Sequence, residues 1–305
     1  MLYPDFGELV QLGQNASRLS ILSKRQSMAA GPGDYTSPFR GQGLSFHEVR
    51  EYHFGDDIRS IDWRVTARTD KAHVKVFTEE RERTVILCID ANAAMRFGTR
   101  GTFKSVQAAR ATALLGWQAN ESKDRVGCIV FGDVPGGIKY FTPTRSRQAL
   151  WQTLKLLSRT VAGENKAPVS PETVLKYLER VGPTGALLLV IGDFPNASEA
   201  LEKRLGNLRR RCDVVLVAIN DPADREIPAM DIVAFEDEAG HKLTLDTDSS
   251  AGREAYARQW RENRKRLEDI AARWRIGVVD LHTDKDVHAD LLLGLRHLNI
   301  GKAAR

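Results

Sequence analysis

Two runs of apolar residues, each followed by a carboxylate, place the strongest constraint on how this chain folds. Residues 85–89 read Val-Ile-Leu-Cys-Ile and lead into Asp90, and the run at 186–191 leads through Gly192 to Asp193. Unbroken runs of this kind are typical of strands that are covered on both faces inside a parallel sheet. Because the carboxyl ends of central strands in such a sheet face the crevice where ligands bind, Asp90 and Asp193 are candidates for one shared site.

The rest of the segment 84–305 alternates between strand and helix patterns, which predicts an α/β fold with a mostly parallel sheet and helices on both faces. The predicted strands are 84–89, 124–131, 186–191, 213–219 and 276–281, with an edge strand at 138–142. The predicted helices are 104–122, 147–161, 172–181, 198–211 and 253–275, and Asp286 caps a closing helix. A β-hairpin at about 231–246 interrupts the pattern.

Residues 1–83 form a separate amino-terminal part in this prediction, a bracket ahead of the sheet domain at 84–305. It starts with a helix whose apolar positions recur at steps of three and four residues. Those positions are Leu9, Leu12, Ala16, Leu19 and Leu22. Two interpretations of the apolar face stay open, docking on the sheet domain or contact with a partner. Residues 28–43 have the glycine and proline density of a loop.

The segment 45–80 combines many charges with aromatic residues. Gly55 is expected to end one short helix, and Asp56 and Asp57 to cap the next. The residues expected to face inward from this second helix are Ile58, Ile61, Val65 and Trp63. The segment also predicts forked ion pairs of Arg50, Arg59, Arg64 and Arg68 with Asp56, Asp57 and Asp62. It serves either as a structural bracket or as a docking surface.

Composition limits the function classes. The 305 residues include 42% hydrophobic ones, yet no run approaches the roughly 20 apolar residues of a membrane span. We also see no signal peptide and expect a cytoplasmic protein. The net charge of +5 is mild, but residues 203–211 contain five basic and no acidic residues, and 253–275 contain eight basic against four acidic. Both stretches are predicted helices, with a solvated outer face as the first interpretation and binding of an acidic protein partner or of nucleic acid as the alternatives.

The block from Gly43 to Arg68, with Glu79-Glu80, the strand that ends in Asp90, and Phe97-Gly98, carries a family resemblance. It resembles the bacterial family called domain of unknown function 58, whose members resemble von Willebrand factor A domains. The resemblance implies a non-enzymatic protein-interaction module that works with a MoxR-type AAA+ ATPase and its clients in chaperone-like maturation. The family-motif residues, which are also the candidates for docking, are Arg50, Tyr52, Gly55, Asp56, Asp57, Arg59, Asp62, Trp63 and Arg68.

The same resemblance implies a divalent cation, Mg²⁺ or Mn²⁺, at the ends of the strands. Von Willebrand A domains often hold one through Asp-x-Ser-x-Ser, a threonine and a further aspartate. The matching positions here are Asp90, Asn92, Thr173 and Asp193, while Ala94 replaces the second serine and the threonine alignment could slip onto Glu172. An amide oxygen still ligates a hard cation, but the missing hydroxyl weakens the site. A degenerate site with two loop-capping aspartates is the competing interpretation.

Enzymatic alternatives have less support in the sequence. Residues 98–105 look like a phosphate-binding loop, but Phe103 stands where the glycine before Lys104 is required. A metal-dependent hydrolase that uses Asp90 and Asp193 would need a second metal or a general base, and no clear candidate for either is found. The Asp and His residues at 280–290 cross a strand end, a loop and a helix start, which does not favour a metal site. We therefore expect no catalytic activity.

Overall fold

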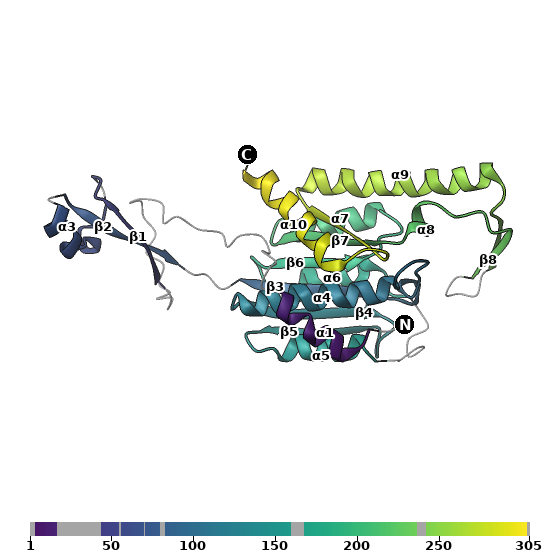
Figure 1. Cartoon of the computed structure of the whole chain (residues 1–305), viewed down its shortest axis with the longest axis horizontal. Helices are drawn as coiled ribbons and strands as arrows, with labels where there is room; N and C mark the ends of the chain where they lie inside the picture. Colours follow the sequence, from purple (N-terminus) through teal and green to yellow (C-terminus); the bar gives the residue numbers. More distant parts are fainter. Residues whose placement is uncertain are drawn as a thin grey trace. The chain divides into compact units, whose positions relative to one another are not determined.

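The computed structural model describes residues 4–16, 44–54, 56–69, 71–79, 83–159, 168–236 and 242–303 (Figure 1). The chain divides into two compact units, a larger one made of Met1–Leu22 with Arg83–Arg305, and a smaller one made of Ser23–Glu82. The smaller unit ends at Glu82, one residue before the predicted boundary between residues 83 and 84. Residues 1–22, which the prediction grouped with the bracket, belong to the larger unit instead.

A six-stranded sheet forms the centre of the larger unit. Its strands are β3 (Thr84–Ala91), β4 (Arg125–Gly132), β5 (Ile138–Thr144), β6 (Leu187–Gly192), β7 (Asp213–Asn220) and β10 (Gly277–His282). They lie in the order β10-β7-β6-β3-β4-β5, and only the edge strand β5 runs antiparallel to its neighbour. Counted along the chain this is the order 3-2-1-4-5-6 of a doubly wound sheet, in which the switch point lies between β3 and β6. The predicted fold class and the predicted edge strand at 138–142 are confirmed.

Helices cover both faces of this sheet (Figure 1). They are α4 (Lys104–Glu121), α5 (Gln148–Leu157), α6 (Pro171–Val181), α7 (Glu199–Arg209), α8 (Pro222–Arg225), α9 (Ser250–Trp274) and α10 (Val287–Ala303), with a short 3-10 turn η2 (Ala93–Met95). Alternate residues of β3 pack into two separate hydrophobic cores, one on each face of the sheet. Val85, Leu87 and Ile89 pack on the side of α4, α5 and α10. Ile86 and Cys88 pack on the side of α6, α7 and α9.

The amino-terminal helix is part of the first of these cores. It is split into α1 (Phe6–Gln11) and α2 (Gly13–Ala16), while the predicted positions Leu19 and Leu22 lie outside the described residues. Leu9 is fully buried. The indole N–H of Trp117 in α4 donates to the carbonyl of Leu9 at 3.0 Å, and Arg110 pairs with Glu8. These contacts confirm the docking interpretation of the helix.

The predicted hairpin is also present. Its strands, β8 (Ile232–Glu236) and β9 (Lys242–Asp246), pair antiparallel in a two-stranded sheet of their own. No helix among the described residues is both long and apolar enough to cross a membrane.

The smaller unit consists of the antiparallel strands β1 (Leu44–Glu51) and β2 (His73–Glu79), the 3-10 turn η1 (Ile58–Ser60) and α3 (Trp63–Thr69). The short helix predicted ahead of Gly55 was wrong, since residues 44–51 form β1, and Gly55 itself lies outside the described residues. Asp57 and Asp62 cap η1 and α3, where they accept backbone N–H groups of Arg59 and Arg64.

The inward orientation predicted for two hydrophobic residues of this unit was wrong. Ile58 is 65% exposed and Trp63 is 69% exposed, whereas Ile61 and Val65 are half-buried. A unit of this size has too little interior to bury four large side chains, because surface dominates volume in small folds.

Candidate site at the carboxyl edge of the sheet

Asp90 lies at the carboxyl end of β3 and is 7% exposed. Its Oδ1 atom accepts two hydrogen bonds from Asn92, one from the backbone N–H and one from the side-chain amide, each at 2.8 Å. On the neighbouring strand, a Cβ atom added to Gly192 would lie 3.2 Å from the Cβ of Asp90. The two strand ends therefore meet closely, as parallel pairing of β3 and β6 requires.

Asn92 connects this strand end to the segment ahead of α6. Its amide donates to the carbonyl of Val169 at 3.0 Å, and its Oδ1 atom accepts from the N–H of Val169 at 2.9 Å. The side-chain oxygen that would bind a cation is thus engaged with the backbone. Thr173 lies exposed in the first turn of α6, and its hydroxyl is 3.0 Å from the hydroxyl of Ser170. Glu172 accepts a hydrogen bond from Ser198.

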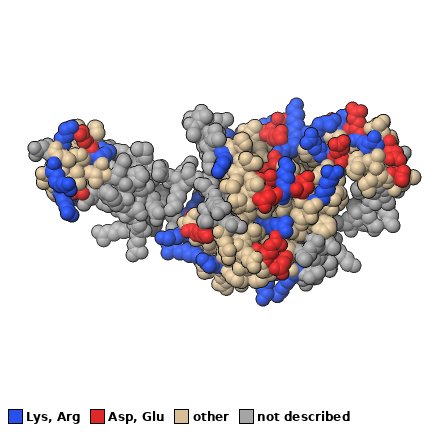
Figure 2. Space-filling model, in the orientation of Figure 1, with Lys and Arg blue, Asp and Glu red and all other residues tan. Residues whose placement is uncertain are grey.

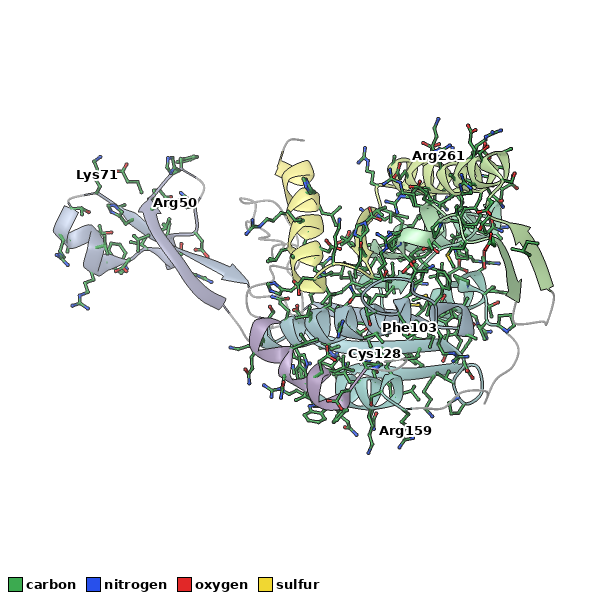
Figure 3. The ribbon with its side chains drawn as sticks, turned by 45° about the vertical axis from the view of Figure 1, so that its right-hand side comes forward. Arg50, Lys71, Phe103, Cys128, Arg159 and Arg261 are labelled. Carbon is green, nitrogen blue, oxygen red and sulfur yellow. The ribbon has the colours of Figure 1, made fainter. Side chains whose placement is uncertain are left out.

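Asp193 follows β6 and pairs with a buried lysine that the sequence interpretation did not assign to the site. Lys104, the first residue of α4, is 4% exposed. Its Nζ atom lies 3.2 Å from Oδ2 of Asp193 and 2.8 Å from Oδ1 of Asp224. Figure 3 labels Phe103, which directly precedes it at the start of α4. The lysine of the rejected phosphate loop therefore neutralises carboxylates at the sheet edge.

Burial and the neighbouring charges have opposite effects on the pKa values of Lys104 and Asp224. Burial alone would lower the pKa of Lys104, but the two facing carboxylates outweigh it and raise that pKa above 10.5. For Asp224 burial is the larger effect and raises its pKa above 3.8, although Lys104 pulls it down. Two carboxylates share one ammonium group, so negative charge is in excess here.

Asp221 is a second residue that the sequence interpretation missed. It is buried and follows β7, where it accepts hydrogen bonds from the N–H and hydroxyl groups of Thr99, from the hydroxyl of Thr283 and from the N–H of Ala223. It also forms a reciprocal capping box with Asp224 at the start of α8. The signal was present, since an aspartate after a predicted strand and before Pro222 is a helix-start pattern.

The two aspartates that end β3 and β6 line different cavities. Asp193 lines one of about 520 Å³, together with Lys104, Asp224 and residues of α9. Asp90 lines one of about 50 Å³, beside the Arg96–Asp133 ion pair, whose atoms are 2.7 Å apart.

The four predicted ligands, Asp90, Asn92, Thr173 and Asp193, fit a divalent cation poorly as arranged. A cation would require Asn92 and Asp193 to exchange their present partners, Val169 and Lys104. Within the described ranges, no three His, Cys, Asp or Glu side chains form a group that could hold a metal ion. A magnesium or manganese site of this composition stays a prediction.

The family-motif residues lie in the smaller unit, apart from this edge in the sequence. Arg50 and Asp56 form a forked ion pair with distances of 2.8 and 2.7 Å, as predicted, and Asp56 also accepts from the N–H of His53. The pKa of Asp56 is lowered by these hydrogen bonds. Figure 3 labels Arg50 and Lys71, whose ammonium group pairs with Glu51 at 2.8 Å.

The other motif residues form backbone hydrogen bonds or are exposed to solvent. Tyr52 is half-buried and its N–H donates to the carbonyl of Ala72 at 2.8 Å. Arg59 and Arg68 are exposed. The large hydrophobic side chains of Phe54, Ile58 and Trp63 are exposed within ten residues of sequence, and Phe54 is fully so. We refer to these three residues as the apolar surface.

The basic helices carry mixed charge. Arg204 pairs with Glu179, and Arg273 pairs with Glu202. Arg264 of α9 pairs with Asp280 of β10. Lys and Arg side chains are interspersed with Asp and Glu side chains around α9 in Figure 2. This mixture does not favour a nucleic-acid interface, which is typically a patch of one sign.

Comparisons with known proteins place the chain among relatives. The family model described as "Protein of unknown function DUF58" matches residues 48–266. The uncharacterized proteins Rv1480 of Mycobacterium tuberculosis and Mb1516 of Mycobacterium bovis are each 27% identical over 265 residues, covering 85% of this chain and 81% of the relative.

Similar solved structures have low sequence identity. BatB from Bacteroides thetaiotaomicron is 16% identical with a TM-score of 0.45, and the match covers 73% of this chain and 98% of that one. The SpRpn10 VWA domain is 9% identical with a TM-score of 0.40, covering 69% and 94%. A von Willebrand factor type A protein from Catenulispora acidiphila is 10% identical with a TM-score of 0.40, covering 73% and 43%.

Proposed function

Since the chain belongs to the DUF58 family of proteins of unknown function, whose model spans both units, we propose that it is a protein-interaction module that docks through its smaller unit. The observation that carries the proposal is the apolar surface of Phe54, Ile58 and Trp63. Ile58 and Trp63 are 65% and 69% exposed, and Phe54 is fully exposed. Three large hydrophobic side chains exposed within ten residues of sequence are unfavourable in water unless a partner covers them, and exposed apolar surface marks interaction sites.

Polar contacts hold the backbone around the apolar surface in place. Arg50 and Asp56, which form the forked ion pair, flank Phe54 in the sequence. Asp57 caps the turn that contains Ile58, and Asp62 caps the helix that starts with Trp63. A surface that is ordered before it binds loses less conformational entropy on association. The charged family motif thus presents the hydrophobic residues in a fixed arrangement.

The proposed partner is a MoxR-type AAA+ ATPase, and the proposed role is an adaptor in chaperone-like maturation of client proteins. The support for this finer statement is the family resemblance of the motif block at 43–68. Trp63 and Phe54 are of the residue class that dominates binding energy in protein interfaces when it becomes buried.

Surface plasmon resonance with a purified MoxR-type ATPase tests this proposal, with the ATPase free, bound to ADP and bound to a non-hydrolysable ATP analogue. Phe54→Ser and Trp63→Ser should each weaken binding by roughly 30-fold, the loss that corresponds to about 2 kcal/mol at an interface hot spot. Leu293→Ser is the matched control, because Leu293 is 57% exposed on α10 of the larger unit. Failure of the wild type to bind in every nucleotide state, or an equal loss in the control, would count against the proposal.

The cation at Asp90 and Asp193 is a separate and testable prediction. Calorimetric titration of Mg²⁺ and Mn²⁺ should give weak binding to the wild type and none to the Asp90→Ala, Asp193→Ala double variant, since both variants remove charged oxygen ligands. Identical heats for the two proteins would show that these aspartates do not hold the cation.

A further inference from the structure

The cavity of about 520 Å³ has the composition of a ligand site. It lies at the carboxyl ends of β6 and β7, where α9 forms its other side, and its volume is in the range of small-molecule pockets. Lys104, Asp193 and Asp224 are its mostly buried charged groups, and Tyr256 and Trp260 of α9 contribute half-buried aromatic rings. Neither the apolar surface nor the Asp90 cavity shares these residues.

The charges that line this cavity do not balance. Lys104 and Arg266 are positive, whereas Asp193, Asp224 and Glu262 are negative. Arg266 and Glu262 are both exposed on α9 and offset each other. The deeper groups are one ammonium and two carboxylates, which leaves one negative charge without a counterion in a poorly solvated place. Such a charge attracts a cation more strongly than an exposed carboxylate does.

The hydrogen bonds leave an acceptor at the same place. Both oxygens of Asp224 are used, Oδ1 by Lys104 at 2.8 Å and Oδ2 by the N–H of Asp221 at 2.7 Å. Asp193 is bound only through Oδ2, by Lys104 at 3.2 Å, and its Oδ1 atom has no hydrogen-bond donor among the residues that the structure describes. The Asp193 side chain as a whole is 12% exposed and lines the cavity, so an N–H donor that enters the cavity can approach this carboxylate.

Two aromatic rings favour the same ligand chemistry. Tyr256 and Trp260 are one helical turn apart on α9, and both line the cavity. The pKa of Tyr256 is raised by its burial and then by the negative charge of Asp224, so its hydroxyl lies in the field of that carboxylate. Aromatic faces next to carboxylates form a favourable environment for guanidinium and ammonium groups.

We propose that this cavity binds an alkyl guanidinium or alkyl ammonium group, with Asp193 as its anionic partner and Trp260 and Tyr256 against its alkyl chain and charge. An anion is disfavoured, since it would lie beside two carboxylates and one already paired lysine. The group has two sources, a free polyamine or an arginine or lysine side chain of a bound protein segment.

Calorimetry at low salt tests the site with three probes. Agmatine represents the free amines, acetyl-Gly-Arg-Gly-amide represents a protein side chain, and acetyl-Gly-Gln-Gly-amide is the uncharged control. We expect saturable binding of agmatine or the arginine peptide and none of the glutamine peptide. Binding of agmatine alone assigns the site to free amines, and tighter binding of the peptide assigns it to protein segments.

Variants connect the binding to these residues. Asp193→Asn keeps the size of the side chain and should lower affinity at least tenfold, because a charge-assisted hydrogen bond is lost. Trp260→Leu should lower it roughly threefold to tenfold, as expected for a cation–π contact. Asp213→Asn is the control, since Asp213 is at the opposite end of β7, paired with Arg83. Equal affinity of Asp193→Asn and wild type, binding of the glutamine peptide, or no binding of either cation overturns the proposal. The Phe54→Ser protein should bind agmatine and the arginine peptide with the affinity of the wild type, because Phe54 does not line the cavity.

Discussion

At the scale of single residues, Asp221 shows how strongly the sheet edge depends on buried polar contacts. It is 2% exposed and accepts hydrogen bonds from Thr99, Thr283 and Ala223, which come from three different segments. Burial alone would raise its pKa, but these hydrogen bonds outweigh it, and the pKa falls below the ordinary 3.8. The ionised form is therefore the one that the fold stabilises.

Asp221→Asn should make the protein less stable by about 2 kcal/mol at pH 7, the scale of hydrogen bonds to a charged group. Because the pKa of Asp221 is lowered in the folded state, its contribution is present above pH 3.8 and is lost as the pH falls through the folded-state pKa. The difference between wild type and variant should therefore shrink below about pH 3.8. Urea unfolding from pH 7 to pH 3 measures it. The exposed Asp269→Asn on α9 is the control, and a difference that stays constant with pH would contradict the argument.

The residues of the sheet edge were only partly predictable. Asp90 and Asp193 could be placed because each ends an apolar strand, and strand ends meet at one edge of a sheet. Their partners could not. Lys104 lies 89 positions from Asp193 and 120 from Asp224, and no local pattern connects residues over such separations. The pairing depends on the packed position of α4, which only the folded sheet determines.

At the scale of elements, α7 and α9 approach each other closely at Gly206. A Cβ atom on Gly206 of α7 would lie 2.6 Å from the indole ring of Trp274 at the end of α9. The indole N–H of Trp274 also donates to Glu202, one turn earlier on α7. The absence of a side chain at position 206 thus allows the large ring of Trp274 to approach α7 closely.

Gly206→Ala should lower stability by about 1–2 kcal/mol, even though alanine is the better helix former by about 1 kcal/mol, because overpacking against the ring costs more. In a Trp274→Leu background the same change should instead be neutral or stabilising. A double-mutant cycle in thermal unfolding measures the coupling. Additive effects of the two changes would show that the ring does not oppose the alanine.

The elements of the larger unit were predictable because each buries a complete face and its periodicity records that burial. The smaller unit was not. A short helix was expected to end at Gly55, whereas residues 44–51 form β1, and Ile58 and Trp63 were expected inside but are exposed. Apolar residues that serve a partner look the same in sequence as apolar residues of a core.

At the scale of the whole molecule, one unit is inserted into the sequence of the other. Among the residues that the structure describes, the two hydrophobic clusters of the larger unit consist of residues within 6–12 and of residues from Val85 onward. The smaller unit is therefore an insertion in the sequence between α2 and β3, and its described residues belong to neither of these two clusters.

Replacement of residues 23–82 by a glycine-serine linker of about ten residues should leave the larger unit folded, since flexible linkers of that kind tolerate many end-to-end distances. We expect its melting temperature to change by no more than about 4 °C, which is close to 1 kcal/mol for a chain of this size. Circular dichroism measures the melting temperature. The protein that lacks residues 23–82 should also fail to bind the ATPase. A molten or aggregated product would show that the insertion supports the larger unit.

The insertion has a mechanical consequence. A pull on the smaller unit is transmitted to the larger one at two points, through Arg83 into β3 and through the preceding chain into α1 and α2. β3 is the strand with β6 on one side and β4 on the other, so the load enters the middle of the sheet and is shared by two ladders. The α1 anchor is held by side-chain contacts, among them the Trp117–Leu9 hydrogen bond, the Glu8–Arg110 ion pair and the edge-on contact of the Phe6 and Trp151 rings, and not by a strand ladder. Under tension this helix should detach first, and the sheet should yield last.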